Sequence, residues 1–112
     1  MDDELQPFEV FLDFLFGIID KVYKSESYEV EEKLVSEVWL RLSELQCGKF
    51  LGLSPGDMPR NLHMAYQILG RLRTRVADNR PTRTLVEWSL GEIRDAIASR
   101  INMLRIAMAR AA

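Results

Sequence analysis

The most constraining feature of this chain is the segment from Pro7 to Tyr23, which would be apolar on nearly every side of a helix. Its apolar residues are Phe8, Val10, Phe11, Leu12, Phe14, Leu15, Phe16, Ile18, Ile19, Val22 and Tyr23. A surface helix of a monomer needs an apolar stripe only somewhat wider than about 100°. In a chain of 112 residues we expect a second chain to supply part of the extra cover. The sequence therefore predicts an association surface near the N-terminus.

A thin polar line along the same segment argues against a membrane location. It consists of Glu9, Asp13, Gly17, Asp20 and Lys24. A spanning helix needs about 20 mostly apolar residues, and this segment is interrupted by three acids. An interfacial helix would carry Lys and Arg on its polar face, whereas this face is acidic. We therefore predict no membrane association.

The composition is that of a globular protein, with 47% hydrophobic and 29% charged residues. The length predicts a single domain over residues 1–112. The lone Cys47 excludes an internal disulfide, and the start of the chain lacks a basic region followed by a cleavage site. These features predict a cytoplasmic protein.

The two halves of the chain carry opposite charge. Residues 1–45 hold twelve acids and four bases, a net charge of −8, and residues 46–112 hold five acids and eleven bases, a net charge of +6. Such halves attract each other, either within one chain or head to tail between two chains. Packing within the chain is the simpler interpretation.

Four helices are predicted, over about 7–23, 28–46, 58–77 and 84–109. The first begins at Pro7, which suits a first turn, and Ser27 and Asp57 are expected to cap the second and third. Thr84 and Glu87 match a capping box at the start of the fourth. The segment from Cys47 to Met58 reads as a loop that plugs one end of a bundle.

The apolar spacing supports these helices. The expected core positions are Val30, Leu34, Val38, Leu42 and Leu45 in the second helix, Leu62, Ala65, Leu69, Leu72 and Val76 in the third, and Val86, Leu90, Ile93, Ile97, Ile101, Leu104 and Met108 in the fourth. Short breaks join helices one and two, and three and four, so each pair is expected to form an antiparallel hairpin. The sequence thus predicts an all-α, four-helix bundle of two hairpins, completed by dimerisation.

No residue pattern points to catalysis or to a cofactor. A metal site needs several converging ligands, and the chain has one His and one Cys, far apart in sequence. His63 lacks the neighbours of a phosphotransfer histidine. Cys47 lies at the expected end of a helix, where the dipole raises the thiol pKa, so an inert thiol is predicted. We expect a non-enzymatic protein with no metal, cofactor or small-molecule substrate.

The arginines of the third helix and its exit leave a nucleic-acid alternative open. Arg60, Arg71 and Arg75 share roughly one face, but the pI of about 5.4 and the long fourth helix argue against a groove-reading motif. Arginine also serves protein interfaces together with Trp and Tyr. The predicted protein-interface residues are Phe8, Phe11, Leu12, Phe14, Leu15, Ile18, Trp39, Tyr66, Arg71, Arg75, Trp88, Leu104 and Met108.

In length, acidity and helix content the chain resembles small helical anti-activators of LuxR-type quorum-sensing transcription regulators. The resemblance implies a homodimer that masks the dimerisation surface of a transcription regulator and so prevents its pairing on DNA. A secretion chaperone or adaptor, and a nucleic-acid-binding protein, are the alternatives. Nucleic-acid binding would weaken steeply as salt rises, whereas apolar masking would not.

We expect the substitutions Phe11→Asp and Phe14→Asp to dissociate the oligomer or to unfold the chain, because each places a charge on the apolar first helix. Light scattering and circular dichroism would separate the two outcomes. Wild-type protein that stays monomeric at high micromolar concentration would contradict the predicted dimer.

Overall fold

The longest helix of the structure, α5 (Arg83–Ala111), is the element against which α1 (Asp2–Lys24) and α4 (Arg60–Arg73) pack most extensively. The remaining helices are α2 (Tyr28–Glu44), which contacts both α1 and α4, and the one-turn α3 (Cys47–Phe50). This computed structural model describes residues 2–24, 28–52, 58–73 and 82–111. Within these ranges every regular element is a helix, which confirms the all-α class.

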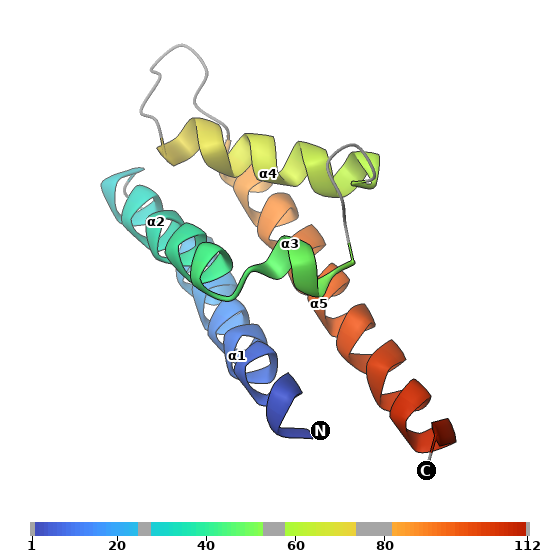
Figure 1. Cartoon of the computed structure of the whole chain (residues 1–112). Coiled ribbons are helices and arrows are strands. Elements are labelled where there is room, and N and C mark those ends of the chain that lie inside the picture. Colours follow the sequence, from blue (N-terminus) through green and yellow to red (C-terminus); the bar gives the residue numbers. More distant parts are fainter. Residues whose placement is uncertain (1, 25–27, 53–57, 74–81, 112) are drawn as a thin grey trace.

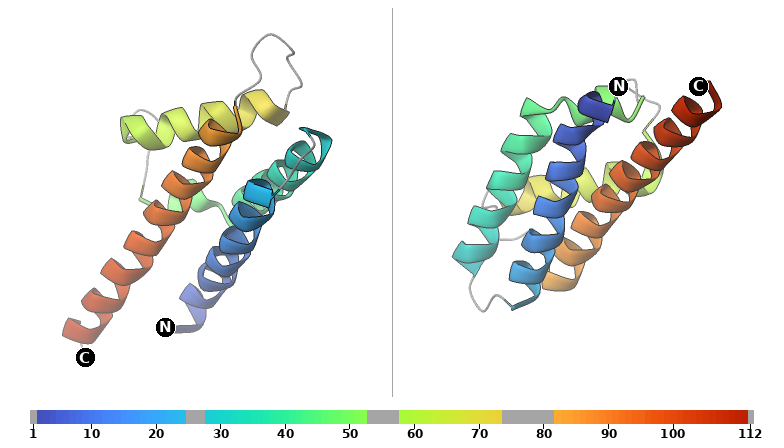
Figure 2. Two further views of the ribbon diagram at one scale, coloured as in Figure 1. Left: turned by 180° about the vertical axis from the view of Figure 1, so that it is seen from behind. Right: turned by 90° about the horizontal axis from the view of Figure 1, so that it is seen from below.

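Three helices lie side by side and a fourth lies across them. α1 is flanked by α2 on one side and by α5 on the other, and both run opposite to α1 (Figure 2). α4 crosses the first half of α5 obliquely (Figure 1). The predicted antiparallel hairpin of the third and fourth helices is therefore not confirmed. The beginning of α1 and the end of α5 lie at the same end of the molecule (Figures 1 and 2).

The predicted helix boundaries were wrong in three places. α1 begins at Asp2, so Pro7 lies inside the helix rather than in its first turn. Because proline has no backbone N–H, Pro7 leaves one intrahelical hydrogen bond of α1 unmade, close to the start of the helix. Thr82, not Thr84, caps α5, since its Oγ1 accepts a 3.3 Å hydrogen bond from the backbone N–H of Leu85. The predicted caps Ser27 and Asp57 lie outside the described residues.

The third difference is α3, which occupies part of the predicted loop. Gln46 adopts a left-handed conformation with φ of 51°, so it ends the preceding turn in place of the predicted Gly48. The backbone N–H of Leu51 then donates to the carbonyl of Cys47 over 2.9 Å, closing one helical turn. The single turn brings Phe50 against Phe8 of α1, with ring centroids 3.6 Å apart.

The core is built on a continuous stripe of α5. Val86, Leu90, Ile93, Ile97 and Ile101 are buried, as their spacing predicted. They form one cluster with residues of the other four helices: Phe11, Leu15, Ile18, Val22, Val35, Val38, Leu42, Cys47, Leu62, Ala65 and Leu69. Burial of each large aliphatic side chain contributes about 1.5–3 kcal/mol.

Polar contacts tie α5 to the first half of the chain. Arg83 Nε donates to Glu31 Oε1 of α2 over 2.9 Å, and Arg105 forms an ion pair with Glu9 of α1. Arg100 Nε donates to the carbonyl of Phe50 over 3.1 Å. Both ion pairs join an acid of the acidic half to an arginine of the basic half. Some of the opposite charges of the two halves therefore pair within one chain.

None of the described helices combines the length and the apolar composition that a membrane crossing requires.

We expect Leu90→Ala to lower the free energy of unfolding by about 2–5 kcal/mol, because it leaves a cavity where α5 packs. Urea denaturation followed by circular dichroism measures this loss. Leu40→Ala is the matched control, since Leu40 is 60% exposed on α2 and its truncation should change stability by less than about 0.5 kcal/mol. Equal losses for the two variants would show that the α5 stripe is not the core.

Candidate interaction surface

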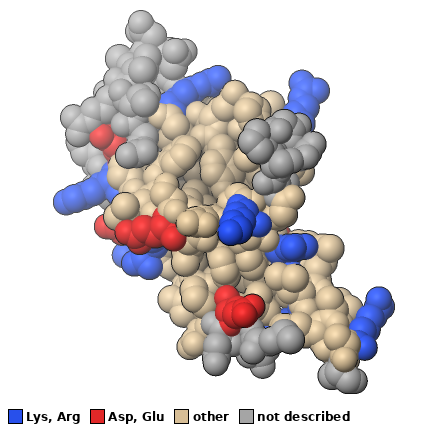
Figure 3. Space-filling model, viewed as in Figure 1, with Lys and Arg blue, Asp and Glu red and all other residues tan. Residues whose placement is uncertain are grey.

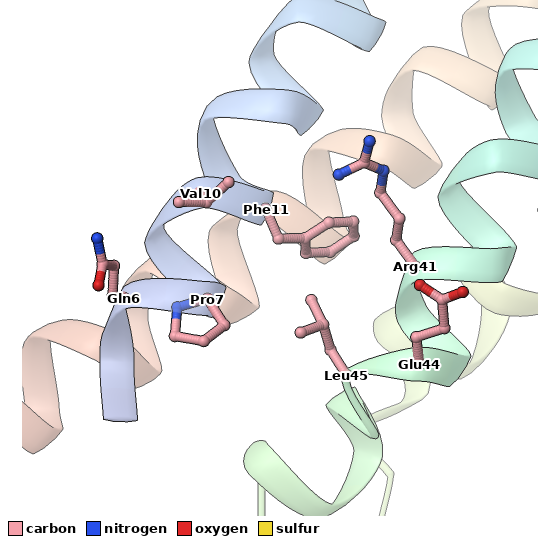
Figure 4. A pocket seen from close by; sticks show the side chains of 7 residues that line it. All are labelled: Gln6, Pro7, Val10, Phe11, Arg41, Glu44 and Leu45. Atoms are coloured by element: carbon pink, nitrogen blue, oxygen red, sulfur yellow. The ribbon is translucent and has the colours of Figure 1, made fainter. Parts of the chain in front are cut away.

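A hollow between described residues forms a groove between α1 and α2. Its volume is about 410 Å³, and we call it the α1–α2 groove (Figure 4). It is lined by Gln6, Pro7, Val10 and Phe11 of α1, by Arg41 and Glu44 of α2, and by Leu45 directly after α2. Phe11 and Leu45 point into the space between the helices, whereas Gln6 points away from it (Figure 4). The groove is thus apolar inside, with one arginine and one carboxylate on the α2 side.

The groove follows from how α1 is rotated against the core. Neighbouring side chains on a helix point about 100° apart, so the burial of Phe11 turns Val10 outward. Phe11 is 1% exposed and belongs to the core, while Val10 is 55% exposed. Packing in the core therefore explains why residue 11 is apolar. It does not explain the apolar side chain of Val10, which is exposed to solvent.

A cation–π contact extends the groove along α1. The guanidinium carbon of Arg41 lies 3.9 Å from the centroid of the Phe14 ring. The ring of Phe14 is in turn 6.0 Å from that of Phe11, measured between centroids. A guanidinium held over an aromatic face keeps N–H donors available to a ligand. Arg41 therefore both covers Phe14 and offers a charge at the edge of the groove.

A second, smaller hollow of about 200 Å³ lies between α2, α3 and α4. Its walls include Trp39 and Tyr66, whose rings meet edge to face with centroids 5.8 Å apart, and the buried Cys47. Burial raises the pKa of the Cys47 thiol to about 11. The pKa of Tyr66 is raised to about 12, first by burial and then by the nearby Cys47 charge. Both groups are therefore neutral and unreactive near neutral pH.

The pKa of Cys47 is raised, as predicted, but the predicted cause was wrong. The sequence placed Cys47 at the end of a helix, where the dipole would act on the thiol. In the structure Cys47 begins α3, and burial is the cause.

The predicted interface residues divide by burial. Phe11, Leu15 and Ile18 lie in the core of the single chain, so this chain already covers them. The half-buried residues are Phe8, Leu12, Phe14, Trp39, Tyr66, Trp88, Leu104 and Met108, and Arg71 is exposed on α4. Arg75 lies outside the described residues. The structure brings Trp39 to Tyr66 and Phe11 to Phe14, but it does not unite the set on one surface.

Sequence reasoning missed most of the groove. Pro7, Val10, Arg41, Glu44 and Leu45 were not selected as interface residues, and only Phe11 was. The outward direction of Val10 follows from the rotation of α1, and the all-round apolar pattern could not fix that rotation. The sequence feature that could have indicated this edge of the groove is the i, i+3 spacing of Arg41 and Glu44, which places both residues on one side of α2.

Other chemistries find little support in the described residues. They contain no group of three or more His, Cys, Asp or Glu side chains that could hold a metal ion. His63 is exposed and accepts a 3.0 Å hydrogen bond from Gln67 Nε2 one turn later. Arg60 and Arg71 are exposed on α4. On the face shown in Figure 3 the described Lys and Arg side chains lie apart from one another, without forming a continuous basic patch.

No family model, curated protein or solved structure matches this chain. The resemblance to anti-activators of LuxR-type regulators therefore stays a prediction from length, acidity and helix content.

We expect iodoacetamide to alkylate Cys47 at pH 8 at least about tenfold more slowly in the folded protein than in urea, because thiolate is the reactive form. Mass spectrometry of timed samples measures both rates. Equal alkylation rates would show that Cys47 is accessible.

The raised pKa of Cys47 also makes its contribution to the free energy of unfolding depend on pH. An unfolded thiol has a pKa of about 8.5. The thiol's contribution to stability is therefore complete below that pH and is lost as pH rises through about 11.

Proposed function

We propose that this protein is a non-enzymatic regulator that binds an apolar helix of a partner protein in the α1–α2 groove. The observation that carries the proposal is that the exposed Val10 and the half-buried Leu45 leave apolar surface open to solvent in this groove. Helix-in-groove recognition uses such surfaces, with apolar anchors one helical turn apart entering the groove. Water that leaves the groove on binding supplies the main favourable free energy.

The charges at the groove edge favour one orientation of the bound helix. Arg41 and Glu44 stand on the same side of α2, about one turn apart. A partner helix with an acid and a base at matching spacing would pair with both, and the reversed helix would meet like charges. Such charge pairing adds more to specificity than to affinity.

The dimerisation helix of a transcription regulator is the target that we propose. Such helices carry apolar side chains at three- and four-residue spacing, which is what a helix-binding groove accepts. A chain that covers this helix competes with pairing of the regulator, so the regulator leaves its operator DNA. This choice of target rests on the resemblance to anti-activators, and a secretion chaperone or adaptor would use the same groove for another helix.

The test uses a LuxR-type regulator from the organism that encodes this chain, bound to fluorescently labelled operator DNA. Addition of the purified chain should lower the anisotropy of the DNA as the regulator dissociates. The chain alone should leave the anisotropy of free DNA unchanged at both low and moderate salt. A rise with the chain alone that disappears at moderate salt would favour the nucleic-acid alternative instead.

We predict that Val10→Asp weakens the displacement of the regulator at least about tenfold, because the carboxylate would be desolvated in the filled groove. The matched control is Leu40→Asp, since Leu40 is similarly exposed but lies on α2 outside the groove. Both variants should melt at the temperature of the wild type within a few degrees. Equal activity of Val10→Asp and wild type would rule out the groove as the binding surface.

A further inference from the structure

The end of α5 carries an apolar face that points away from the core. Met103 is 57% exposed and Ile106 is 45% exposed, and Arg110 is exposed one turn further on. The three residues follow i, i+3, i+7 spacing and therefore share one side of the helix. They lie roughly opposite the buried stripe that ends at Ile101. We call Met103, Ile106 and Arg110 the α5 outer face.

We propose that the α5 outer face of a second copy of this chain occupies the α1–α2 groove, and that two copies exchange these segments in a two-fold dimer. The inference rests on the proposed function only in that the groove accepts a helix. It does not depend on the identity of the regulator.

The arrangement of the chain permits a reciprocal exchange. The groove is formed by the first turns of α1 and the last turn of α2, and the α5 outer face lies close to the end of α5. Both regions lie at the same end of the molecule (Figures 1 and 2). A two-fold axis beside that end places each α5 against the groove of the other copy. The interface then closes on itself as a dimer and does not continue into a filament.

Charge complementarity favours the α5 end as the occupant. Residues 96–111 contain three arginines and no acid. Arg100 donates to the carbonyl of Phe50 and Arg105 pairs with Glu9, while Arg110 is exposed beyond them. The groove edge carries Glu44 next to Arg41, whose guanidinium lies over the Phe14 ring, and Glu4 is exposed at the start of α1. Arg110 of one copy would therefore meet Glu44 of the other.

The apolar anchors suit the volume and the chemistry of the groove. A hollow of about 410 Å³ has room for the side chains of Met103 and Ile106 together. The flexible thioether of Met103 adapts to an irregular apolar wall such as that of Pro7, Val10 and Leu45. Because only two apolar side chains enter each groove, we expect a dissociation constant in the micromolar range. A partner helix with more anchors would then displace the second copy.

The test is the oligomeric state of the full chain, measured by sedimentation velocity over a micromolar concentration series. We expect a monomer–dimer equilibrium for the wild type and a dissociation constant at least about tenfold larger for Ile106→Asp. The control is Leu85→Asp, because Leu85 is 42% exposed on the same helix but near its other end. This variant should dimerise like the wild type, and circular dichroism should show that both variants are folded.

A mixing experiment tests the ion pair itself. Arg110→Glu and Glu44→Arg should each weaken self-association, because each brings like charges together at both contacts of the dimer. An equimolar mixture of the two variants should restore association, because each contact again joins an arginine to a glutamate. A wild type that is monomeric at high micromolar concentration would overturn the proposal. So would a dimer that Ile106→Asp leaves intact, or a mixture that fails to associate.

The same variants separate this inference from the proposed function. Ile106→Asp leaves the groove unaltered, so it should still displace the regulator from DNA, and at lower concentration because no second copy competes. Unchanged dimerisation in Ile106→Asp, with displacement lost in Val10→Asp, would overturn the exchange alone. Normal displacement by Val10→Asp would overturn the proposed function.

Discussion

The buried stripe of α5 holds this fold together, because α1 and α4 both pack against the same helix. Val86, Leu90, Ile93, Ile97 and Ile101 face the core. The one polar side chain buried among them on α5 is Ser89, whose hydroxyl donates to the carbonyl of Leu85 over 2.7 Å. The helices that α5 gathers have different lengths, and α5 runs on to Ala111 beyond the buried stripe. Packing on α5 thereby fixes the rotation of α1, and the rotation of α1 decides which apolar side chains remain in solvent.

The groove is a direct consequence of that rotation. With Phe11, Leu15, Ile18 and Val22 turned into the core, Val10 has to face outward beside α2. The last turn of α2 supplies the opposite wall, and the left-handed Gln46 ends that wall by turning the chain into α3. A segment that is apolar on nearly every side thus serves two purposes: one side builds the core and another lines an open groove. The proposed binding function follows from the second.

Sequence reasoning succeeded where a periodic pattern was long and failed where one residue decided the outcome. The spacing of α5 predicted its buried stripe because the same apolar side repeats over about four turns. The one-turn α3 was missed because its four residues, which include Gly48, are too few to show a helical repeat of apolar residues. The cap of α5 was misplaced because Thr84 and Glu87 match the capping-box motif, whereas in the structure Thr82 accepts the hydrogen bond that caps the helix. The groove could not be predicted for another reason: Val10 and Phe11 are equally apolar, and only tertiary packing turns one inward and the other outward.

The central claim is that the α1–α2 groove binds a helix of another protein. Methyl NMR spectra of the full chain, recorded while the regulator is added, test this claim most directly through the signals of Val10 and Leu45. We predict that these two signals shift or broaden first, while the methyl signal of Leu40 on the outer side of α2 stays in place. Signals of Val10 and Leu45 that remain unchanged while other methyl groups respond would contradict the claim.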